Sequence, residues 1–597
     1  MTPAREPAYT RYEQITVAQC LLKYLELEGV KKIFGVPGGA IKYVLDELSK
    51  QRSCFEYVIC RQETGAAYMA DGYARLTGKL GVVLVTSGPG ATNALTGAVN
   101  AQCSNSSVLV ISGEVPEEDF GKGFLQEGAD AGLDVNAVYR GACQYTALIS
   151  SPSDFQTLFA QAIRGAMARP RRTTHISLPE DVSSKTIRDA AVPNRSSNYR
   201  ATASCSDPKQ AKQALDLVLG AKRPLLFLGA GCREALVEEQ RRKALEQLVD
   251  KLALPVMTSP GAKGLFSESH PFSLRTYGLA GCEWPRYYLS PHLLDPDLPC
   301  HYDCLVVLAS SLGDLATHMW DKALTPAGPF VQVDLDQGVL GRAFPIDLGI
   351  VAEVGRFLDD FLEQGEQATP DEAIVKTRRR LVEHIREQSP YRDPDKRGSD
   401  ASPILPQALM RCLSEELKNV RGGAHVFIDA GNCVGWALHY LEVDPPVQVH
   451  SALAMGPMGF GVGSVIGAKL AAPDRVCVGI VGDGAFLMHG SEVSTAARYR
   501  VGAIWVVLFD DDLAMVSQGM NFYFPDPRWN HYYAIGQPDL VKFAEALGAT
   551  AYAIQAADEL RWAFSQAITA AETEHKPQVI IAHHDHSEVP PYYPVRK

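Results

Sequence analysis

Short apolar runs recur along the first third of the chain and alternate with longer segments of helical periodicity. Nearly every position in these runs is apolar, which is typical of strands that helices cover on both faces. Between residues 12 and 190 the runs are Lys32–Val36, Glu56–Ile59, Gly81–Thr86 and Ser107–Ser112. Because strands that alternate with helices form parallel sheets, this region is expected to be an α/β domain.

The same alternation returns twice. Between residues 205 and 365 the runs are Pro224–Gly229, Pro255–Thr258, Cys304–Ala309 and Phe330–Leu335. Between residues 402 and 584 they are His425–Asp429, Val476–Val481, Ala503–Phe509 and Gln578–Ala582. The pattern therefore predicts an α/β protein with three doubly wound parallel-sheet domains, over 12–190, 205–365 and 402–584, followed by a tail over 585–597.

Two polar segments separate these regions. Val192–Pro208 is rich in Ser, Asn, Ala and Pro and is expected to be a linker. Glu363–Asp400 is strongly charged and contains the run Arg378-Arg379-Arg380. We expect it to form a solvated helix and a second linker.

Composition narrows the class of protein. The chain has 597 residues, of which 46% are hydrophobic and 21% charged, and its net charge is −12. These values are typical of a globular protein, and the acidic balance argues against a nucleic-acid partner. Leu80–Gly113 and Pro445–Ala468 lack charged residues but are broken by Gly, Pro, Ser and Asn, which argues against membrane helices. The scattered cysteines and the absence of an apolar stretch at the N-terminus predict a reduced, cytoplasmic protein.

The clearest chemical motif lies at residues 481–485, directly after a predicted strand. Gly482, Gly484 and Ala485 allow backbone N–H groups to approach a phosphate at the start of the next helix. Asp483 lies where it could bind a metal ion, and the following strand ends at Asp510, with Asp512 close behind. Because the ends of parallel strands meet at one sheet edge, these oxygens predict a site for Mg²⁺, with Ca²⁺ or Mn²⁺ as alternatives.

This combination resembles the diphosphate–metal signature of thiamine-diphosphate enzymes. Cys60–Arg75 is similar to the pyrimidine-binding segment of the acetolactate synthase-type members, in which a Glu begins the helix. The resemblance implies that Glu63 is a catalytic acid at the pyrimidine ring of thiamine diphosphate. It also implies that the side chains of Asp483 and Asp510 and the carbonyl of Asp512 bind the metal, although the family has Asn-Asn where this chain has Phe509-Asp510.

Four further segments extend the resemblance. Gly35–Gly39 is similar to the family's substrate-facing loop, with Pro37 and Gly38, and Thr86–Asn93 to a segment near the cofactor ring, with Asn93. Gly123–Glu127 resembles the loop that brings a Gln, here Gln126, to the reaction centre. Gly456–Gly461 resembles the segment in which the carbonyl of Gly456 accepts the cofactor's amine and Met458 separates the two rings. Met515 is expected to pack over the pyrimidine.

The resemblance implies an activity. Such an enzyme forms a ylide on the cofactor, decarboxylates a 2-oxo acid such as pyruvate and transfers the acyl carbanion to a carbonyl acceptor. It also implies a homodimer with active sites at the subunit interface, or a dimer of dimers. Within the superfamily, a simple 2-oxo acid decarboxylase, an acyl-CoA lyase or decarboxylase and a flavin-dependent oxidase remain alternatives. A catalytically silent regulatory homologue is the alternative of another class.

Several positions depart from acetolactate synthases. The family's His before the catalytic Glu is Gln62, and its Arg and Trp acceptor-recognition positions are Ser517 and Gly519. The loss of a cation and of a large ring favours an uncharged aldehyde or ketone acceptor over a second 2-oxo acid. In the middle region, Gly229-Ala230-Gly231 is similar to a dinucleotide site. However, Ser310–Asp314 replaces the Arg-rich flavin segment, which argues against bound FAD.

The C-terminal tail allows two interpretations besides that of a solvated tail. His583-His584-Asp585-His586 has metal-binding residue types but no complete ligand pattern, so a solvated tail is the preferred interpretation. Alternatively, the tail through Pro590–Tyr593 folds over the active site as a lid, as C-terminal segments do in relatives.

Overall fold

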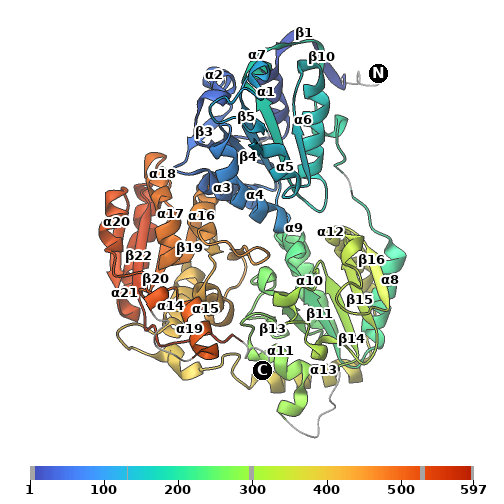
Figure 1. The fold of residues 1–597 in the computed structure, drawn as a ribbon. Helices are drawn as coiled ribbons and strands as arrows, with labels where there is room; N and C mark the ends of the chain where they lie inside the picture. The colour runs from blue at the N-terminus through green and yellow to red at the C-terminus, as the bar shows by residue number, and fades with distance from the viewer. Residues whose placement is uncertain (1–6, 131, 203, 295–301, 525–530, 593–597) are drawn as a thin grey trace.

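The computed structural model describes residues 7–130, 132–202, 204–294, 302–524 and 531–592, and in it the chain forms three α/β domains (Figure 1). Each domain contains a six-stranded sheet. All pairings within the three sheets are parallel. The predicted fold class is therefore confirmed.

The N-terminal domain has the strand order β3-β2-β4-β5-β9-β8. In this order the strands are β3 (Glu56–Ile59), β2 (Lys32–Gly35), β4 (Gly81–Val85), β5 (Val108–Glu114), β9 (Thr173–Pro179) and β8 (Tyr145–Leu148). The helices are α1 (Val17–Leu27), α2 (Lys42–Lys50), α3 (Glu63–Thr77), α4 (Pro89–Cys103), α5 (Val135–Arg140), α6 (Pro152–Met167) and α7 (Glu180–Ser184). An antiparallel pair, β1 (Tyr9–Thr16) and β10 (Thr186–Pro193), joins the two ends of the domain.

The middle domain has the strand order β13-β12-β11-β14-β15-β16. These strands are β13 (Ser273–Thr276), β12 (Val256–Thr258), β11 (Pro224–Leu228), β14 (Cys304–Leu308), β15 (Phe330–Asp334) and β16 (Leu348–Val351). Its helices are α8 (Pro208–Gly220), α9 (Arg233–Leu236), α10 (Glu239–Leu252), α11 (Glu283–Leu289), α12 (Val354–Gln367) and α13 (Glu372–Arg386).

The C-terminal domain has the strand order β18-β17-β19-β20-β22-β21. The strands are β18 (Gln448–Ser451), β17 (Ala424–Ile428), β19 (Val476–Gly482), β20 (Ile504–Phe509), β22 (Gln578–His583) and β21 (Thr550–Ile554). The helices are α14 (Pro406–Asn419), α15 (Asn432–Tyr440), α16 (Phe460–Ala471), α17 (Asp483–His489), α18 (Val493–Arg498), α19 (Ala514–Tyr523), α20 (Leu540–Ala546) and α21 (Ala557–Thr573).

Burial explains why the apolar runs locate the central strands. Every residue of β4, β5, β11, β14 and β20 is buried, because helices cover both faces of each sheet. All twelve predicted strands are present, and their ends differ from the prediction by at most two residues. Among the described residues every cysteine is a free thiol, and no helix is both long and apolar enough to cross a membrane.

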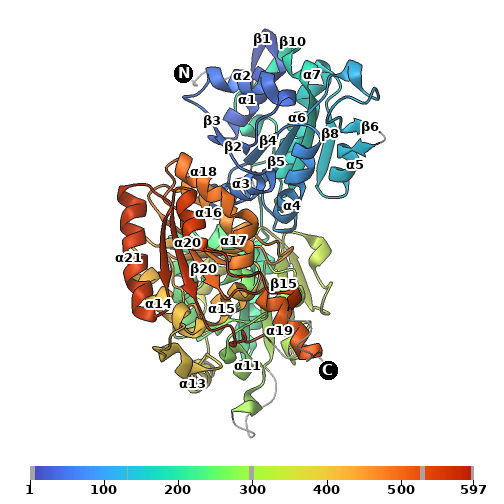
Figure 2. The ribbon, with the colours of Figure 1, turned by 60° about the vertical axis from the view of Figure 1, so that its left-hand side comes forward.

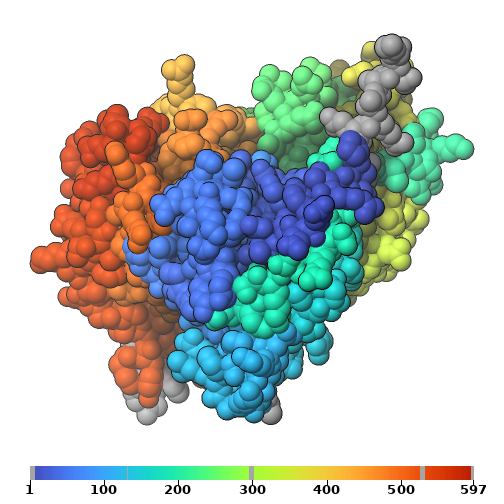
Figure 3. All heavy atoms as spheres, turned by 90° about the horizontal axis from the view of Figure 1, so that it is seen from above, coloured from blue at the N-terminus to red at the C-terminus, as the bar shows by residue number. Residues whose placement is uncertain are grey.

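Seen from above, the N-terminal domain lies over parts of the other two (Figure 3). Its helix α3 packs against α16 of the C-terminal domain (Figure 2). A Cβ atom on Gly72 would lie 2.1 Å from the carbonyl oxygen of Ser464, and one on Gly467 would lie 1.9 Å from that of Met69. The Ser464 hydroxyl donates to the carbonyl of Tyr68 at 3.0 Å. The two helices therefore approach backbone to backbone, which only glycine permits at these positions.

The charged segment Glu363–Asp400 differs from the prediction at one residue. It contains the expected helix, α13, but Arg378 on that helix is only 3% exposed. Its guanidinium donates to the carbonyls of Leu252, Val218 and Ala221 at 2.6–2.8 Å. Burial lowers its pKa, and the three acceptors compensate the buried charge. The solvated-helix interpretation is therefore wrong for Arg378.

Replacing Arg378 with Met should destabilise the middle domain, since three buried carbonyls would lose their donors. We expect a loss of about 3 kcal/mol, or about 6–12 °C in the midpoint of thermal unfolding for a domain of this size. Arg380→Met is the matched control, because Arg380 is exposed on the same helix. Equal midpoints for the two variants would contradict the assigned role of Arg378.

Candidate active site

The first half of the candidate site lies at the C-terminal edge of the third sheet. β19 ends at Gly482 and pairs with β20, so Asp483 and the segment after Phe509 meet there. One oxygen of Asp483 accepts from the amides of Asp510 and Asp511 at 3.2 and 3.0 Å, and the other accepts from the amide of Gly484 at 2.7 Å. The structure thus brings Asp483 and Asp510 together, as their spacing indicated.

The electrostatics of this edge favour a cation. Burial raises the pKa of Asp483 to about 6. Burial and then the negative charge of Asp483 raise the pKa of Asp510 to about 8. Asp511 and Asp512 each have a buried carboxylate oxygen without a hydrogen-bond partner. The described residues contain no group of three or more His, Cys, Asp or Glu side chains that could hold a metal ion. Two mutually repelling carboxylates, those of Asp483 and Asp510, together with a backbone carbonyl would fit a divalent ion.

The side chain of Asp512 is already engaged, because its carboxylate accepts a hydrogen bond from the Ser517 hydroxyl. This leaves the backbone carbonyl as the predicted ligand, and that assignment stays a prediction. Ser517, at the position where the family has a cation, is only 5% exposed. By contrast, a Cβ atom on Gly519 would meet no atom within 4 Å.

Met458 lies directly against the glycine turn that precedes α17. A Cβ atom on Gly484 would be 3.1 Å from Cε of Met458, so this glycine makes room for the methionine. The hydroxyl of Tyr68, on α3 of the N-terminal domain, donates to the Met458 carbonyl at 3.5 Å. Gly456 is exposed with φ +69°, and nothing lies within 4 Å of its missing Cβ, so the turn is open on that side. Met515, at the start of α19, is 42% exposed.

Asp429, which no sequence motif marks as a site residue, supports the Gly456–Gly461 segment. Its carboxylate accepts from the amides of Gly459 and Gly461 at 2.9 Å, and burial raises its pKa to about 7. Its position directly after β17, beside β19, was the only available signal. An Asp-Ala-Gly sequence at that point equally fits an ordinary turn.

The second half of the candidate site lies in the N-terminal domain. Glu63 is the first residue of α3, is 8% exposed, and accepts a hydrogen bond from Nδ2 of Asn93 at 3.0 Å. Gln62 caps the helix, because its side-chain oxygen accepts from the amide of Thr64 at 3.1 Å. The predicted pair Glu63 and Asn93 therefore meets.

Two more predicted loops converge on the same region. A Cβ atom on Gly38, next to the exposed Pro37, would lie 2.5 Å from the Thr86 side chain. One on Gly88 would lie 2.9 Å from the carbonyl oxygen of Gln126. Gln126 itself has φ +61° and is exposed. The structure therefore brings the loops of Gly38 and Gln126 against the Thr86–Gly88 segment that precedes α4.

In the described residues the two halves meet through α3 but without a direct bond from Glu63. Among the residues that the structure describes, no hydrogen bond or ion pair connects Glu63 with the Asp483–Asp512 cluster. The start of α3 instead contacts Glu492, in the turn that follows α17. Within one chain α3 is thus linked to the C-terminal half through Glu492 and, by Tyr68, through the Met458 carbonyl.

The tail was predicted to be solvated, but up to residue 592 several of its residues contact the C-terminal domain. His584 is 7% exposed, and its Nε2 lies 3.6 Å from a carboxylate oxygen of Asp510. Glu588 pairs with Lys396 at 2.8 Å, and the Tyr592 hydroxyl donates to the carbonyl of Gly431 at 3.3 Å. These contacts hold the described part of the tail along the C-terminal domain. Its last five residues, 593–597, lie outside the described ranges.

The glycine-rich turn of the middle domain is occupied by the chain itself. A Cβ atom on Gly229 would lie 2.1 Å from the carbonyl oxygen of Ala309, and one on Gly231 would lie 2.8 Å from the Ala309 Cβ. Close packing of this loop therefore explains both glycines. They therefore give no support for a flavin at this domain.

Three parallel-sheet domains, with a buried acid at the start of a helix in the first and an acidic glycine turn in the third, define the class of thiamine-diphosphate-binding proteins. Sequence models of this class match in the same order. They are the thiamine pyrophosphate enzyme N-terminal TPP binding domain at residues 15–133, the central domain at 211–361 and the C-terminal TPP binding domain at 429–582.

Individual relatives agree with this class. The chain is 30% identical over 569 residues to a Methanococcus aeolicus protein named "Probable acetolactate synthase large subunit", covering 93% of this chain and 90% of the relative. It is 29% identical over 563 residues to the acetolactate synthase isozyme 3 large subunit of Escherichia coli, covering 93% and 92%. The chain belongs to the thiamine pyrophosphate enzyme family and resembles its acetolactate synthase large subunits.

Asp510→Asn should raise the stability of the metal-free protein and lower its affinity for Mg²⁺. An acid whose pKa is raised by folding loses its contribution to stability as the pH rises through that pKa. The variant should therefore be more stable than the wild type without metal, by an amount that grows as the pH rises from about 4 to about 8. Its affinity for Mg²⁺ should fall on the order of 10-fold because an anionic ligand is lost. Thermal unfolding and calorimetric titration measure the two effects, and equal metal affinity would contradict Asp510 as a ligand.

Proposed function

We propose that this protein is a thiamine-diphosphate-dependent carboligase that decarboxylates a 2-oxo acid such as pyruvate and transfers the resulting acyl group to a carbonyl acceptor. The observation that supports this most directly is the buried Glu63, held by Asn93 at the first position of α3. A carboxyl group placed there has a specific use in this family, at the pyrimidine ring. Its retention also argues against a catalytically silent homologue.

The residues of the C-terminal half would hold the other end of the cofactor. The carboxylates of Asp483 and Asp510 and the carbonyl of Asp512 would bind Mg²⁺, and the amides at the start of α17 would receive the diphosphate. The Gly456 carbonyl and Met458 would fix the pyrimidine ring. When bound, the cofactor supplies a carbon nucleophile for the 2-oxo acid carbonyl. The chain itself orients the ring and holds a proton at Glu63.

The surroundings of α19 favour an uncharged acceptor. Met515 and Val516 expose 42% and 50% of their surface at the start of this helix, and Gly519 leaves space beside them. Ser517, the remaining candidate for binding a carboxylate, is buried against Asp512. An aldehyde or ketone therefore suits this surface better than a second 2-oxo acid, although the relatives are named acetolactate synthases.

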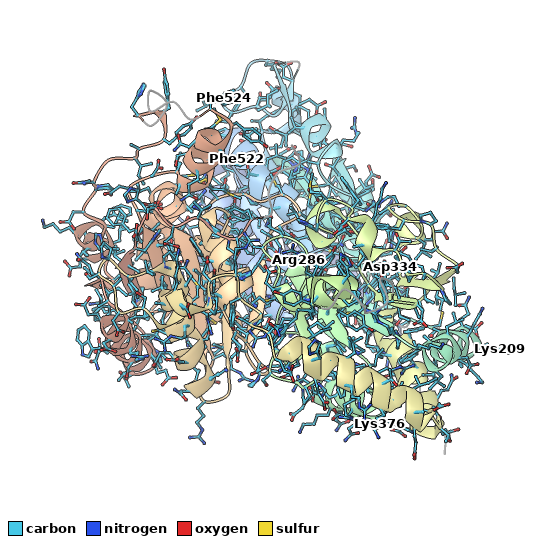
Figure 4. All side chains as sticks on the ribbon, turned by 90° about the horizontal axis from the view of Figure 1, so that it is seen from below. Lys209, Arg286, Asp334, Lys376, Phe522 and Phe524 are labelled. Carbon is cyan, nitrogen blue, oxygen red and sulfur yellow. The ribbon has the colours of Figure 1, made fainter. Side chains whose placement is uncertain are left out.

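A homodimer would unite the two half-sites, with Glu63 of one subunit facing Asp483 of its partner. Leu487 and Met488, next to the glycine turn, are 38% and 58% exposed. Phe522 and Phe524, at the end of α19, are 57% and 55% exposed and point away from the body of the chain (Figure 4). Exposed apolar groups around an incomplete site are typical of a surface that a partner covers.

Glu63→Gln should abolish activation of the cofactor without preventing its binding. We expect proton–deuterium exchange at the thiazolium C2 to slow on the order of 100-fold or more, because a general acid is lost. A mass-spectrometric screen of 2-oxo acid donors against aldehyde, ketone and 2-oxo acid acceptors would identify the reaction. Fast acetolactate formation without aldehyde- or ketone-derived products would contradict the proposed acceptor class.

Mixing two inactive variants tests the shared site. A dimer of Glu63→Gln with Asp483→Asn contains one intact site and one doubly altered site if each site draws on both subunits. Random pairing of equal amounts should then restore about a quarter of wild-type activity, since half of the dimers carry one working site of two. Co-expression with two affinity tags would allow the mixed dimer to be isolated. A mixed dimer as inactive as its parents would contradict the interfacial site.

A further inference from the structure

Glu492 is a buried acid at the junction of the N-terminal and C-terminal domains. It ends the short turn Gly490–Glu492, which follows α17, and it is 0% exposed. Its carboxylate accepts from the amide of Arg61 at 3.0 and 3.2 Å and from the amide of Gln62 at 3.0 Å. The Thr495 hydroxyl adds a fourth hydrogen bond at 2.6 Å. A carboxylate from one domain therefore binds the two residues that directly precede α3 in another.

The two amides that Glu492 binds lead into Glu63. Backbone N–H groups at the start of a helix lack partners within the helix, and a negative charge there is stabilised by the helix dipole. Fixing the amides of Arg61 and Gln62 fixes the backbone from which the Glu63 side chain departs. Asn93 then holds the carboxyl end of that side chain.

Gly65 shows that this contact determines the sequence of α3. A Cβ atom at this position would lie 2.3 Å from Oε1 of Glu492 and 2.8 Å from its Cδ. Glycine is unfavourable in a helix, so its presence in the first turn of α3 needs a local cause. The approach of the Glu492 carboxylate is that cause, and any larger residue at position 65 would displace it.

Other contacts at the same junction join the two domains without reaching the amides of residues 61 and 62. The Arg61 guanidinium donates to Oγ of Ser494 at 2.7 Å, and the Tyr499 hydroxyl accepts from the amide of Ile59 at 2.8 Å. These hydrogen bonds can keep the domains docked when Glu492 is altered. They provide matched controls, because they separate docking of the domains from placement of the start of α3.

We propose that Glu492 is a positioning residue that sets the place of Glu63 by binding the backbone at the start of α3. The inference rests on the proposed function of Glu63. If Glu492 has this role, the C-terminal domain of each chain positions the catalytic acid of that same chain. In the proposed dimer that acid serves the site whose metal lies in the partner.

The principal test compares Glu492→Gln with wild type and Glu63→Gln, each loaded with thiamine diphosphate and Mg²⁺. The amide side chain has the shape of Glu but offers one acceptor oxygen instead of two and carries no charge. We expect C2 exchange to slow about 10- to 100-fold, as a small misplacement of a catalytic group does. Cofactor affinity should stay within about threefold of wild type, since the residues that bind it are untouched.

Amide hydrogen exchange gives a second readout that does not depend on activity. A peptide that covers residues 59–66 should lose protection in Glu492→Gln and keep it in the control Ser494→Ala. Ser494→Ala should also retain wild-type C2 exchange. If Glu492→Gln keeps both its amide protection and a C2 exchange rate within twofold of wild type, the positioning role is excluded while the proposed function stands. If wild type itself shows no C2 exchange, the proposed function and the inference both fail.

Gly65→Ala approaches the same contact from the other side and leaves every charge in place. Its added methyl group should displace the carboxylate and slow C2 exchange as Glu492→Gln does. Combining it with Glu492→Asp, which is one methylene shorter, should recover part of the loss. If Glu492→Gln does not fold, Thr495→Val removes only the hydroxyl donor to Glu492 and should slow exchange several-fold. Unchanged exchange in Thr495→Val or in Gly65→Ala would overturn the proposal.

Discussion

The close packing of α3 against α16 is the contact on which the geometry of the candidate site depends. Gly72 and Gly467 bring the two helix backbones together, and each would be within about 2 Å of a carbonyl oxygen if it carried a side chain. Buried residues of both domains form one hydrophobic core across this contact. Because α3 begins with Glu63, the packing of these helices determines where the acid stands relative to the third domain.

Buried carboxylates organise the site, and backbone amides rather than cationic side chains compensate most of them. Asp429 binds the amides of Gly459 and Gly461, Asp483 those of Gly484, Asp510 and Asp511, and Glu492 those of Arg61 and Gln62. Each acid thereby fixes a turn or a helix start next to a predicted ligand-binding residue. Burial raises the pKa of all three, which shows that the amides do not fully offset the lost hydration.

Asp483 differs from the other two acids because further acids surround it. Asp510 adds a negative charge, and Asp511 and Asp512 add carboxylate oxygens that lack partners. A protein that needed only a stable turn would not gather unpaired acids at one strand end, since each raises the energy of its neighbours. Asp429 and Glu492, with no such neighbours among the described hydrogen-bond partners, are suited to hold backbone. Buried acids therefore have two roles here. Acids with acidic neighbours are suited to bind a metal, and isolated acids are suited to hold the backbone.

Buried strands that are mostly apolar could be predicted from the sequence. Buried strands that are mostly polar could not. Central strands such as β4 and β20 are apolar throughout, so their runs marked them within two residues. β9 was missed although all its residues are buried, because His175, Thr173 and Ser177 interrupt its apolar pattern. In the structure both ring nitrogens of His175 have hydrogen-bond partners, the hydroxyls of Ser112 and Thr146 at 2.9 and 2.7 Å. These partners allow the polar ring to be buried. No spacing rule in one chain could have revealed those partners.

In the candidate site, residues that belong to motifs could be predicted from the sequence, whereas the residues that support them could not. Glu63, Asp483 and Met458 lie within glycine-marked segments whose local chemistry is visible in sequence. Glu492 and Asp429 act on backbone amides that are distant in sequence or lie in another domain, so their partners carry no recognisable side chain. Gly65 is the sequence feature that corresponds to the Glu492 contact, because a glycine in the first turn of a helix needs a local cause. A glycine inside a predicted helix beside a catalytic residue is therefore a useful place to look for a supporting group from elsewhere in the chain.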